Sequence, residues 1–204
     1  PQNTQFVLEV LRLVSENDLI AEVGGGTGNY TRKLLGLFPK VGMTFIEPSP
    51  EMMAFAKKRL SDLPTQITFL EKTLDQALPE LEPHDLFIFQ RSLYSFYSDI
   101  KEYEVMARRL YGKTAPGGRI AIHELGEKYD IGQMRQYIPA AQAQSKLSEV
   151  EFEESARIFL EVLQEFNEAV DRKIFTLFKP EQLVSIFTAA GYTLLNQEGT
   201  TYFF

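Results

Sequence analysis

Four glycines and one carboxylate lie close together in residues 22–28, which read Glu-Val-Gly-Gly-Gly-Thr-Gly. Glycine lacks a Cβ, so this run lets the backbone turn sharply and lets a ligand approach the main chain. The helix that we expect to begin near Tyr30 would direct its free N–H groups toward an anionic or polar group. The chemistry to expect is the binding of a polar small molecule at a strand-to-helix turn.

The spacing of these glycines excludes two common ligand motifs. A dinucleotide fingerprint needs Gly-x-Gly-x-x-Gly, but the third position falls on Asn29 or Thr31 in the two registers. A phosphate-binding P-loop fails because no Gly-Lys-Ser/Thr follows. The pattern that fits is an acidic residue followed by glycines at every second position, namely Glu22, Gly24, Gly26 and Gly28.

This pattern resembles the first motif of the class I S-adenosylmethionine-dependent methyltransferases. Later segments resemble that family in the expected order: 85–90 with its leading Asp, the Pro-Gly-Gly turn of 116–122, and the helix of 179–191. The resemblance covers about residues 18–125 and 177–204. It implies an α/β fold with a Rossmann-like, doubly wound seven-stranded sheet whose last strand is antiparallel, and it implies S-adenosyl-L-methionine as the cofactor.

In that family the glycine backbone approaches the methionine part and ribose of the cofactor, and the acid, here Glu22, orients the loop or the cofactor ammonium. Glu47 follows the apolar run 41–46, where a carboxylate can accept hydrogen bonds from both ribose hydroxyls. Asp75, with Thr73 as a substitute, corresponds to the acid that contacts the adenine amine. The resemblance implies a cofactor site of Glu22, Gly24, Gly25, Gly26, Gly28, Glu47, Pro48, Met52, Thr73, Leu74, Asp75 and Gln90.

The loop after residues 85–90 is the expected acceptor side of the site. It lacks the Asn/Asp-Pro-Pro-aromatic motif of relatives that methylate exocyclic base amines or glutamine, which favours a small-molecule acceptor. Arg91 is suited to pair with an acceptor carboxylate, with the cofactor carboxylate or with an acid on a helix. Tyr94, Phe96 and Tyr97 are candidates for an aromatic wall of the site or for the core.

His123 follows the strand expected at 116–122, at the edge where open α/β sheets bind ligands. It is the catalytic candidate as a general base, with a structural role as the alternative. A base is needed only if the acceptor must lose a proton. We expect His84 in a surface loop. The residues expected to bind the acceptor are Arg91, Tyr94, His123 and Tyr137.

Residues 126–176 are expected to interrupt the core between the fifth strand and the last core helix. A capping box at 148–151 precedes apolar residues at steps of four and three, which predicts a long amphipathic helix. A looser helix is expected at 131–147. We expect one methyltransferase domain over 1–204, with 126–176 as a helical lid over the acceptor; a packing appendage and a homodimer face are the alternatives.

The composition agrees with one soluble domain. The chain is 44% hydrophobic and 24% charged, and its apolar runs are too short to span a bilayer. The net charge of −7 argues against nucleic acid as the main partner. The absence of cysteine excludes a disulfide scaffold, a thiolate metal site and covalent cysteine catalysis. We expect a cytoplasmic enzyme without a metal ion.

Three functions remain open from the sequence. The favoured one is transfer of a methyl group from S-adenosylmethionine to an O or N atom of a small molecule. An RNA or protein methyltransferase is the first alternative, and the lack of a basic surface counts against it. The second alternative is a methyltransferase-like domain that binds cofactor without turnover, because fold alone does not fix chemistry.

Overall fold

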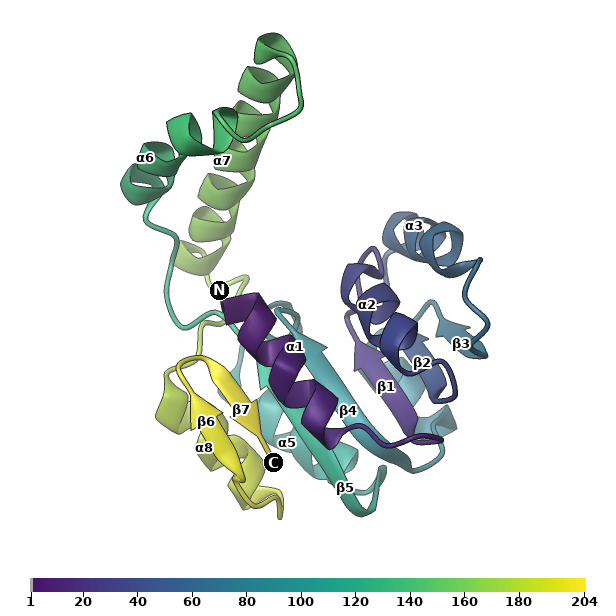
Figure 1. Cartoon of the computed structure of the whole chain (residues 1–204). Helices are drawn as coiled ribbons and strands as arrows, with labels where there is room; N and C mark the ends of the chain where they lie inside the picture. The colour runs from purple at the N-terminus through teal and green to yellow at the C-terminus, as the bar shows by residue number, and fades with distance from the viewer. Residues whose placement is uncertain (1) are drawn as a thin grey trace.

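A computed structural model describes residues 2–204 of the chain, with the side chains of residue 6 and of residues 8–204. Its centre is a seven-stranded sheet in the order β3-β2-β1-β4-β5-β7-β6 (Figure 1). The first five strands in the chain pair in parallel, whereas β7 is antiparallel to both β5 and β6. The strands are β1 (Leu19–Val23), β2 (Gly42–Ile46), β3 (Ile67–Leu70), β4 (His84–Gln90), β5 (Thr114–His123), β6 (Asn196–Glu198) and β7 (Thr201–Phe203). The predicted doubly wound sheet with an antiparallel last strand is confirmed.

The central strands are nearly continuous apolar runs because helices cover both faces of the sheet. In β4, residues 86–89 are all buried, and so are residues 120–122 of β5. Side chains of successive residues in a strand point to opposite faces, so each strand supplies both layers of the core. Ile20 of β1 therefore joins one core cluster and Ala21 joins the other.

Two helical layers complete the sandwich. Helices α1 (Gln2–Leu13), α2 (Asn29–Leu37) and α3 (Pro50–Leu60) pack on one face through apolar side chains. The other face is covered by α4 (Leu74–Ala77), α5 (Ile100–Tyr111) and α8 (Pro180–Ala189). Two short 3₁₀ helices, η1 (Leu78–Glu80) and η2 (Leu93–Ser95), lie in the connections after α4 and β4. Figure 1 shows α1 crossing the sheet in front of β4 and β5, with α5 and α8 behind.

Helices α6 (Ile131–Gln142) and α7 (Glu149–Asp171) form a hairpin between β5 and α8. They contact each other and project beyond the sheet rather than covering one of its faces (Figure 1). The predicted capping box is present, since the Ser148 hydroxyl accepts from the Glu151 N–H and Glu151 returns the interaction. Of the residues of α7, only Leu163 and Phe166 are buried, whereas Val150 is 74% and Phe159 50% exposed. Much of the amphipathic face predicted from the sequence therefore meets solvent.

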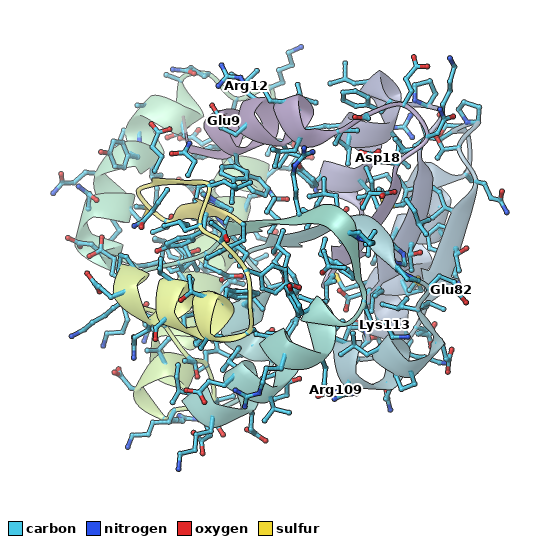
Figure 2. The ribbon with its side chains drawn as sticks, turned by 90° about the horizontal axis from the view of Figure 1, so that it is seen from below. Glu9, Arg12, Asp18, Glu82, Arg109 and Lys113 are labelled. Atoms are coloured by element: carbon cyan, nitrogen blue, oxygen red, sulfur yellow. The ribbon has the colours of Figure 1, made fainter. Side chains whose placement is uncertain are left out.

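Helix ends follow the capping signals in the sequence. Ser49 accepts a hydrogen bond from the Met52 N–H at 3.2 Å, and Pro50 occupies the first turn of α3. Asp99 and Asp130 cap α5 and α6 in the same way. Charged side chains pair on the outer surface, as Figure 2 shows for α1, where Arg12 contacts Glu9 at 2.8 Å.

Two expectations about the ends of strands were wrong. His84 begins β4 and is buried, with Nε2 2.9 Å from the Thr44 hydroxyl and Nδ1 2.7 Å from the Glu82 carbonyl. Burial lowers the pKa of His84. The sequence of residues 192–196 also predicts a short strand, but β6 begins only at Asn196. Gly191 and Tyr192 still close the end of α8, where the Tyr192 N–H donates to the Phe187 carbonyl at 3.1 Å.

Within residues 2–204, no helix is long and apolar enough to cross a membrane.

The central position of β4 predicts a large cost for truncating Phe87, whose side chain is fully buried. We expect Phe87→Ala to lower the free energy of unfolding by about 3–5 kcal/mol, since it removes apolar contacts and leaves a cavity. The matched control is Phe55→Ala on α3, where the ring is 62% exposed and the expected change is below about 0.5 kcal/mol. Urea titrations measure both values, and equal losses would contradict this placement of the core.

Candidate cofactor and acceptor site

A pocket of about 390 Å³ lies at the carboxyl ends of β1, β2 and β4, the edge where open α/β sheets bind ligands. Loops from four strands contribute to it. It is lined by Val23, Gly24, Gly26, Ile46, Glu47, Pro48, Met52, Lys72, Thr73, Leu74, Asp75, Arg91, Ser92, Tyr94, Ser95, Phe96 and Tyr97. Eight of the residues predicted to bind cofactor and two predicted to bind the acceptor are among them, so this edge brings both sides of the predicted site together.

The glycine loop lines the pocket with Gly24 and Gly26, and the space beside its backbone is open at Gly26. The N–H groups of Gly24 and Gly25 donate to the Ile46 carbonyl at 2.8 and 3.2 Å, which holds the loop against the end of β2. A Cβ on Gly24 would lie 2.5 Å from the Cβ of Ser92, whereas a Cβ on Gly26 would meet nothing within 4 Å. Gly26 also has a φ of +56°, in the left-handed region that favours glycine. The exposed main chain at Gly26 is thus where a ligand can approach closely.

Glu47 joins the glycine loop to the turn after β2. Its Oε2 accepts from the Gly26 N–H and its Oε1 accepts from the Ser49 N–H, both at 2.9 Å. Each carboxylate oxygen has a second lone pair, so Glu47 can still accept hydrogen bonds from a ligand in the pocket that it lines. The carboxylate therefore both shapes the site and remains available within it.

Glu22 lies behind the loop rather than in the pocket. It is buried and accepts a hydrogen bond from the Thr31 hydroxyl on α2. Burial raises the pKa of Glu22 to about 8, and the hydrogen bond from Thr31 opposes that shift. The neighbouring Tyr30 hydroxyl is buried and has no hydrogen-bond partner in the described chain. Of the two roles considered from the sequence, contact with the loop and its helix fits this position, because the side chain points toward α2.

The far end of the pocket is organised around Asp75. The Tyr97 hydroxyl donates to Asp75 Oδ2 at 2.5 Å, and the Arg109 guanidinium pairs with Oδ1. Burial, with the hydrogen bond to Asp75, raises the pKa of Tyr97. Thr73 caps α4 by accepting from the Gln76 N–H, so its hydroxyl is already engaged. The contact of Arg109 with Asp75 ties α5 to the pocket.

The loop after β4 forms the opposite wall. Arg91 has a φ of +53°, and its N–H donates to the His123 carbonyl at 2.7 Å. The Ser92 hydroxyl donates to the Val23 carbonyl at 2.7 Å, which ties this loop to the end of β1. The Tyr94 ring packs edge-on against Phe166 and Phe175, with centroids 5.1 and 5.0 Å away. Through Tyr94, the pocket wall contacts the base of the helical hairpin.

Glu124, which follows β5, holds the loop after β4 through hydrogen bonds to its backbone. Its Oε1 accepts hydrogen bonds from the Ser92 and Leu93 N–H groups, both at 2.7 Å, while Oε2 is buried without a partner in the described chain. Burial raises the pKa of Glu124 to about 7, and the hydrogen bonds from backbone N–H groups oppose that shift. The sequence offered no signal for this role, because the contact joins residues about 30 positions apart.

Several predicted site residues do not line the pocket. Gly25 packs against the Phe45 ring, and Gly28 packs against α3. Gln90 ends β4 beside His123 in the ladder. Tyr137 lies on α6 with 60% of its surface exposed. The remaining ones that the structure places outside the lining are Glu22 and His123.

The expectation that His123 contacts the acceptor differs from the structure. The side chain is 1% exposed, its Nδ1 lies 2.9 Å from the Thr201 hydroxyl, and its ring packs 5.4 Å from that of Phe6. Burial, and to a smaller extent the positive charge of Arg91, lowers the pKa of His123 to about 4. The ring points toward α1 because residues alternate between the two faces of β5.

Five lining residues are not among those predicted from the sequence: Val23, Ile46, Lys72, Ser92 and Ser95. Val23 and Ile46 are the last residues of their strands, so the strand ends themselves were the available signal. Lys72 pairs with Glu80 at 2.5 Å. In residues 2–204 there is no group of three or more His, Asp or Glu side chains that could hold a metal ion.

The strand order, the glycine turn and a pocket at the carboxyl edge define a Rossmann-like methyltransferase fold. Residues 20–118 match the family described as "Methyltransferase domain". The cyclopropane synthase MmaA2 from Mycobacterium tuberculosis superposes with a TM-score of 0.68 at 16% identity, covering 98% of this chain and 63% of that one. At this identity the superposition supports the fold alone.

Two curated relatives share sequence with part of the chain. Malonyl-[acyl-carrier protein] O-methyltransferase 1 of Ilyobacter polytropus is 32% identical over 109 residues, 53% of this chain and 38% of the relative. The malonyl-[acyl-carrier protein] O-methyltransferase of Anoxybacillus flavithermus is 40% identical over 78 residues, 38% of this chain and 29% of the relative. The chain thus spans less than two fifths of either. Over residues 20–118 the chain is similar to methyltransferase domains, in agreement with the resemblance to the class I S-adenosylmethionine-dependent methyltransferases.

Glu22 should make the stability of this fold depend on pH. Its folded-state pKa is raised from 4.5 to about 8, so its contribution is fully present below 4.5 and is lost as pH rises through 8. Glu124 adds an effect of the same sign up to about pH 7. We expect the free energy of unfolding to fall between about pH 5 and pH 8, by at most about 1.4 kcal/mol per pH unit for each group.

Urea titrations at several pH values measure this slope. Glu22→Gln keeps an acceptor for the Thr31 hydroxyl and removes the titration, so it should flatten the slope. Glu153→Gln on the exposed side of α7 is the matched control and should leave the slope unchanged. A slope that persists unaltered in Glu22→Gln would contradict the assignment.

Proposed function

We propose that this domain transfers a methyl group from S-adenosyl-L-methionine to an oxygen or nitrogen atom of a small-molecule acceptor. One observation carries the proposal: a single pocket joins an open glycine backbone and Glu47 on one side to Arg91 and Tyr94 on the other. A two-substrate transfer needs such a juxtaposition, because most of its rate comes from holding the reactants in line and excluding water.

The residues of the first side fit the cofactor. The open backbone at Gly26 suits the methionine and ribose part, and the free lone pairs of Glu47 suit the ribose hydroxyls. Pro48, Met52 and Leu74 offer apolar contact for the adenine, with Asp75 at its edge. When bound, the cofactor supplies a methyl group that its sulfonium already activates. The chain therefore has to orient the acceptor and keep water out.

The chain offers no histidine for proton removal in this pocket. His84 and His123 are both buried outside its lining, and Asp75 is engaged by Tyr97 and Arg109. An acceptor that is already nucleophilic at neutral pH, such as a carboxylate, fits this set better than one that must first lose a proton. The two curated relatives are named O-methyltransferases of a malonyl group on acyl-carrier protein, which supports oxygen over nitrogen.

The alternatives have less support. The net charge of −7 does not suit an RNA partner. A domain that binds the cofactor without turnover would not need a second set of lining residues, such as Arg91 and Tyr94, for an acceptor. A cytoplasmic location without nucleic-acid partners is part of the same proposal, and so is a single domain over 1–204 in which 126–176 acts as a lid.

Cofactor binding gives the first test. Glu47→Ala should weaken binding of S-adenosylhomocysteine by about 1.5–3 kcal/mol, the range for hydrogen bonds to charged groups. Gly26→Val should abolish binding, because its side chain would enter the pocket and its backbone would be strained at a φ of +56°. Isothermal titration calorimetry measures both, with NAD as the competing ligand and Glu153→Ala on α7 as the control.

Circular dichroism must show that the variants keep the fold, since Glu47 also holds two loops. Binding of NAD in place of S-adenosylhomocysteine would refute the proposal. An unchanged dissociation constant in a folded Glu47→Ala protein would refute the ribose assignment alone.

The hairpin gives the second test. Its base contacts the pocket wall, because Phe166 of α7 packs on Tyr94 and, 5.2 Å away, on Tyr129. A lid should therefore become ordered when the pocket fills, and amide hydrogen exchange in 126–147 should slow on addition of S-adenosylhomocysteine and acceptor. Amide hydrogen exchange in residues 149–162 is the internal comparison and should change less, because apolar side chains in this part of α7 are solvent-exposed at several positions.

Unchanged exchange in 126–147 would favour a static appendage. Protection that depends on protein concentration rather than on ligand would favour the homodimer face instead.

A further inference from the structure

Two cationic side chains, Lys72 and Arg91, line the pocket, and they differ in whether an acidic side chain pairs with them. Lys72 pairs with Glu80 at 2.5 Å. The Arg91 side chain forms no hydrogen bond or ion pair with any residue in the described part of the chain, 2–204. By contrast, Arg109 is paired with Asp75, which lines the pocket. Arg91 is thus a positive charge at the pocket wall without an internal counter-charge.

The backbone around Arg91 is held in a conformation that a non-glycine residue rarely adopts. Its φ of +53° is left-handed, and the residue is anchored by its N–H on the His123 carbonyl at 2.7 Å. The next two N–H groups, of Ser92 and Leu93, donate to Glu124 Oε1 at 2.7 Å each. Three consecutive amides are therefore tied to the end of β5. Strained non-glycine residues persist where such surroundings over-determine them, and they gather at ligand sites.

The charges of the pocket are divided between its walls. The carboxylates Glu47 and Asp75 follow β2 and β3, and both accept hydrogen bonds from groups of the chain. Beside Arg91, the wall formed by the loop after β4 is neutral and consists of Ser92, Tyr94, Ser95, Phe96 and Tyr97. An anionic group at this wall would meet one free guanidinium, whereas an amine would be repelled by it.

We propose that the acceptor carries a carboxylate that Arg91 binds, and that Glu124 is the positioning residue that holds Arg91 at the pocket. The inference rests on the proposed function and specifies its substrate class. A guanidinium matches the two oxygens of a carboxylate with parallel hydrogen bonds, which gives direction as well as attraction. The Tyr94 ring next to it offers the apolar contact that the rest of a small acid needs.

The observations favour a carboxylate over a phosphate. A phosphate carries up to two negative charges and three acceptor oxygens, and protein sites usually meet them with several donors or a helix N-terminus. Among the described lining residues, Arg91 is the one cation on the wall formed by the loop after β4. The other cation of the lining, Lys72, follows β3 and is paired with Glu80. A single planar guanidinium suits a singly charged, planar group.

The test uses the full chain in two stages. The first titration with S-adenosylhomocysteine measures cofactor binding by itself. The second titrates the saturated protein with a panel of small carboxylic acids and acyl thioesters that bear a free carboxylate, each paired with its neutral carboxamide and with an amine of similar size. We expect acids to bind and their carboxamides to bind at least about tenfold more weakly, as for loss of a charge-assisted hydrogen bond.

The variants separate charge from geometry. Arg91→Gln should weaken the acid by about tenfold or more and leave S-adenosylhomocysteine binding intact, because the change is confined to the acceptor side. Arg91→Lys should restore part of the affinity, since it keeps the charge but loses the planar fork. Arg108→Gln changes another exposed arginine, on α5 and outside the lining; it is the matched control and should change neither.

Glu124→Ala tests the positioning role. If Glu124 holds the loop for Arg91, the variant should lose acid affinity and the preference of acid over carboxamide together. If Glu124 serves stability alone, the variant should melt earlier and keep both values, which would refute the positioning role.

The outcomes also separate this inference from the proposed function. Failure of S-adenosylhomocysteine to bind would overturn the proposed function. Normal cofactor binding would leave the function standing and overturn the Arg91 inference in any of three cases: no acid of the panel binds, carboxamides or amines bind as well as acids, or Arg91→Gln leaves acid affinity unchanged.

Discussion

The hydrogen bond from the Gly26 N–H to the Glu47 carboxylate is the contact on which the rest of the site depends. It joins the loop after β1 to the turn after β2 at 2.9 Å, and the other oxygen of Glu47 holds the Ser49 N–H at the start of α3. Because the carboxyl ends of parallel strands meet at one edge, a single side chain can set the relative position of two loops there. The open backbone of Gly26 then faces a pocket whose walls are already in place.

Buried carboxylates recur around this pocket, and each holds a different segment. Glu22 holds α2 through Thr31, and Glu124 holds the loop after β4 through the Ser92 and Leu93 amides. Burial of an acid is unfavourable, and it raises the pKa of both groups. Backbone N–H groups and a hydroxyl offset part of that cost.

The helical hairpin of α6 and α7 leaves part of its apolar surface uncovered. Helix α7 has the apolar face that its sequence predicts, but α6 and the aromatic residues at its base cover only part of that face. Its exposed apolar side chains, such as Val150 and Val162, distinguish it from the compact sheet and its two helical layers. The packing of Tyr94 on Phe166 joins the base of the hairpin to the wall of the pocket.

The sequence by itself determined the succession of core strands and helices along the chain, the capping box at Ser148 and the glycine turn, because these depend on local spacing and on apolar periodicity. The sheet with its antiparallel last strand was implied by the resemblance to the methyltransferase family. It also identified Glu47 and Arg91, which follow directly after strands and so must lie at the ligand edge. The tertiary structure decided which neighbours face the pocket. His123 turns toward Phe6 and Glu22 toward α2, because alternation along a strand sends adjacent side chains to opposite layers. The contacts of Arg109 with Asp75 and of Glu124 with Ser92 join residues 34 and 32 positions apart, a separation that no local pattern encodes.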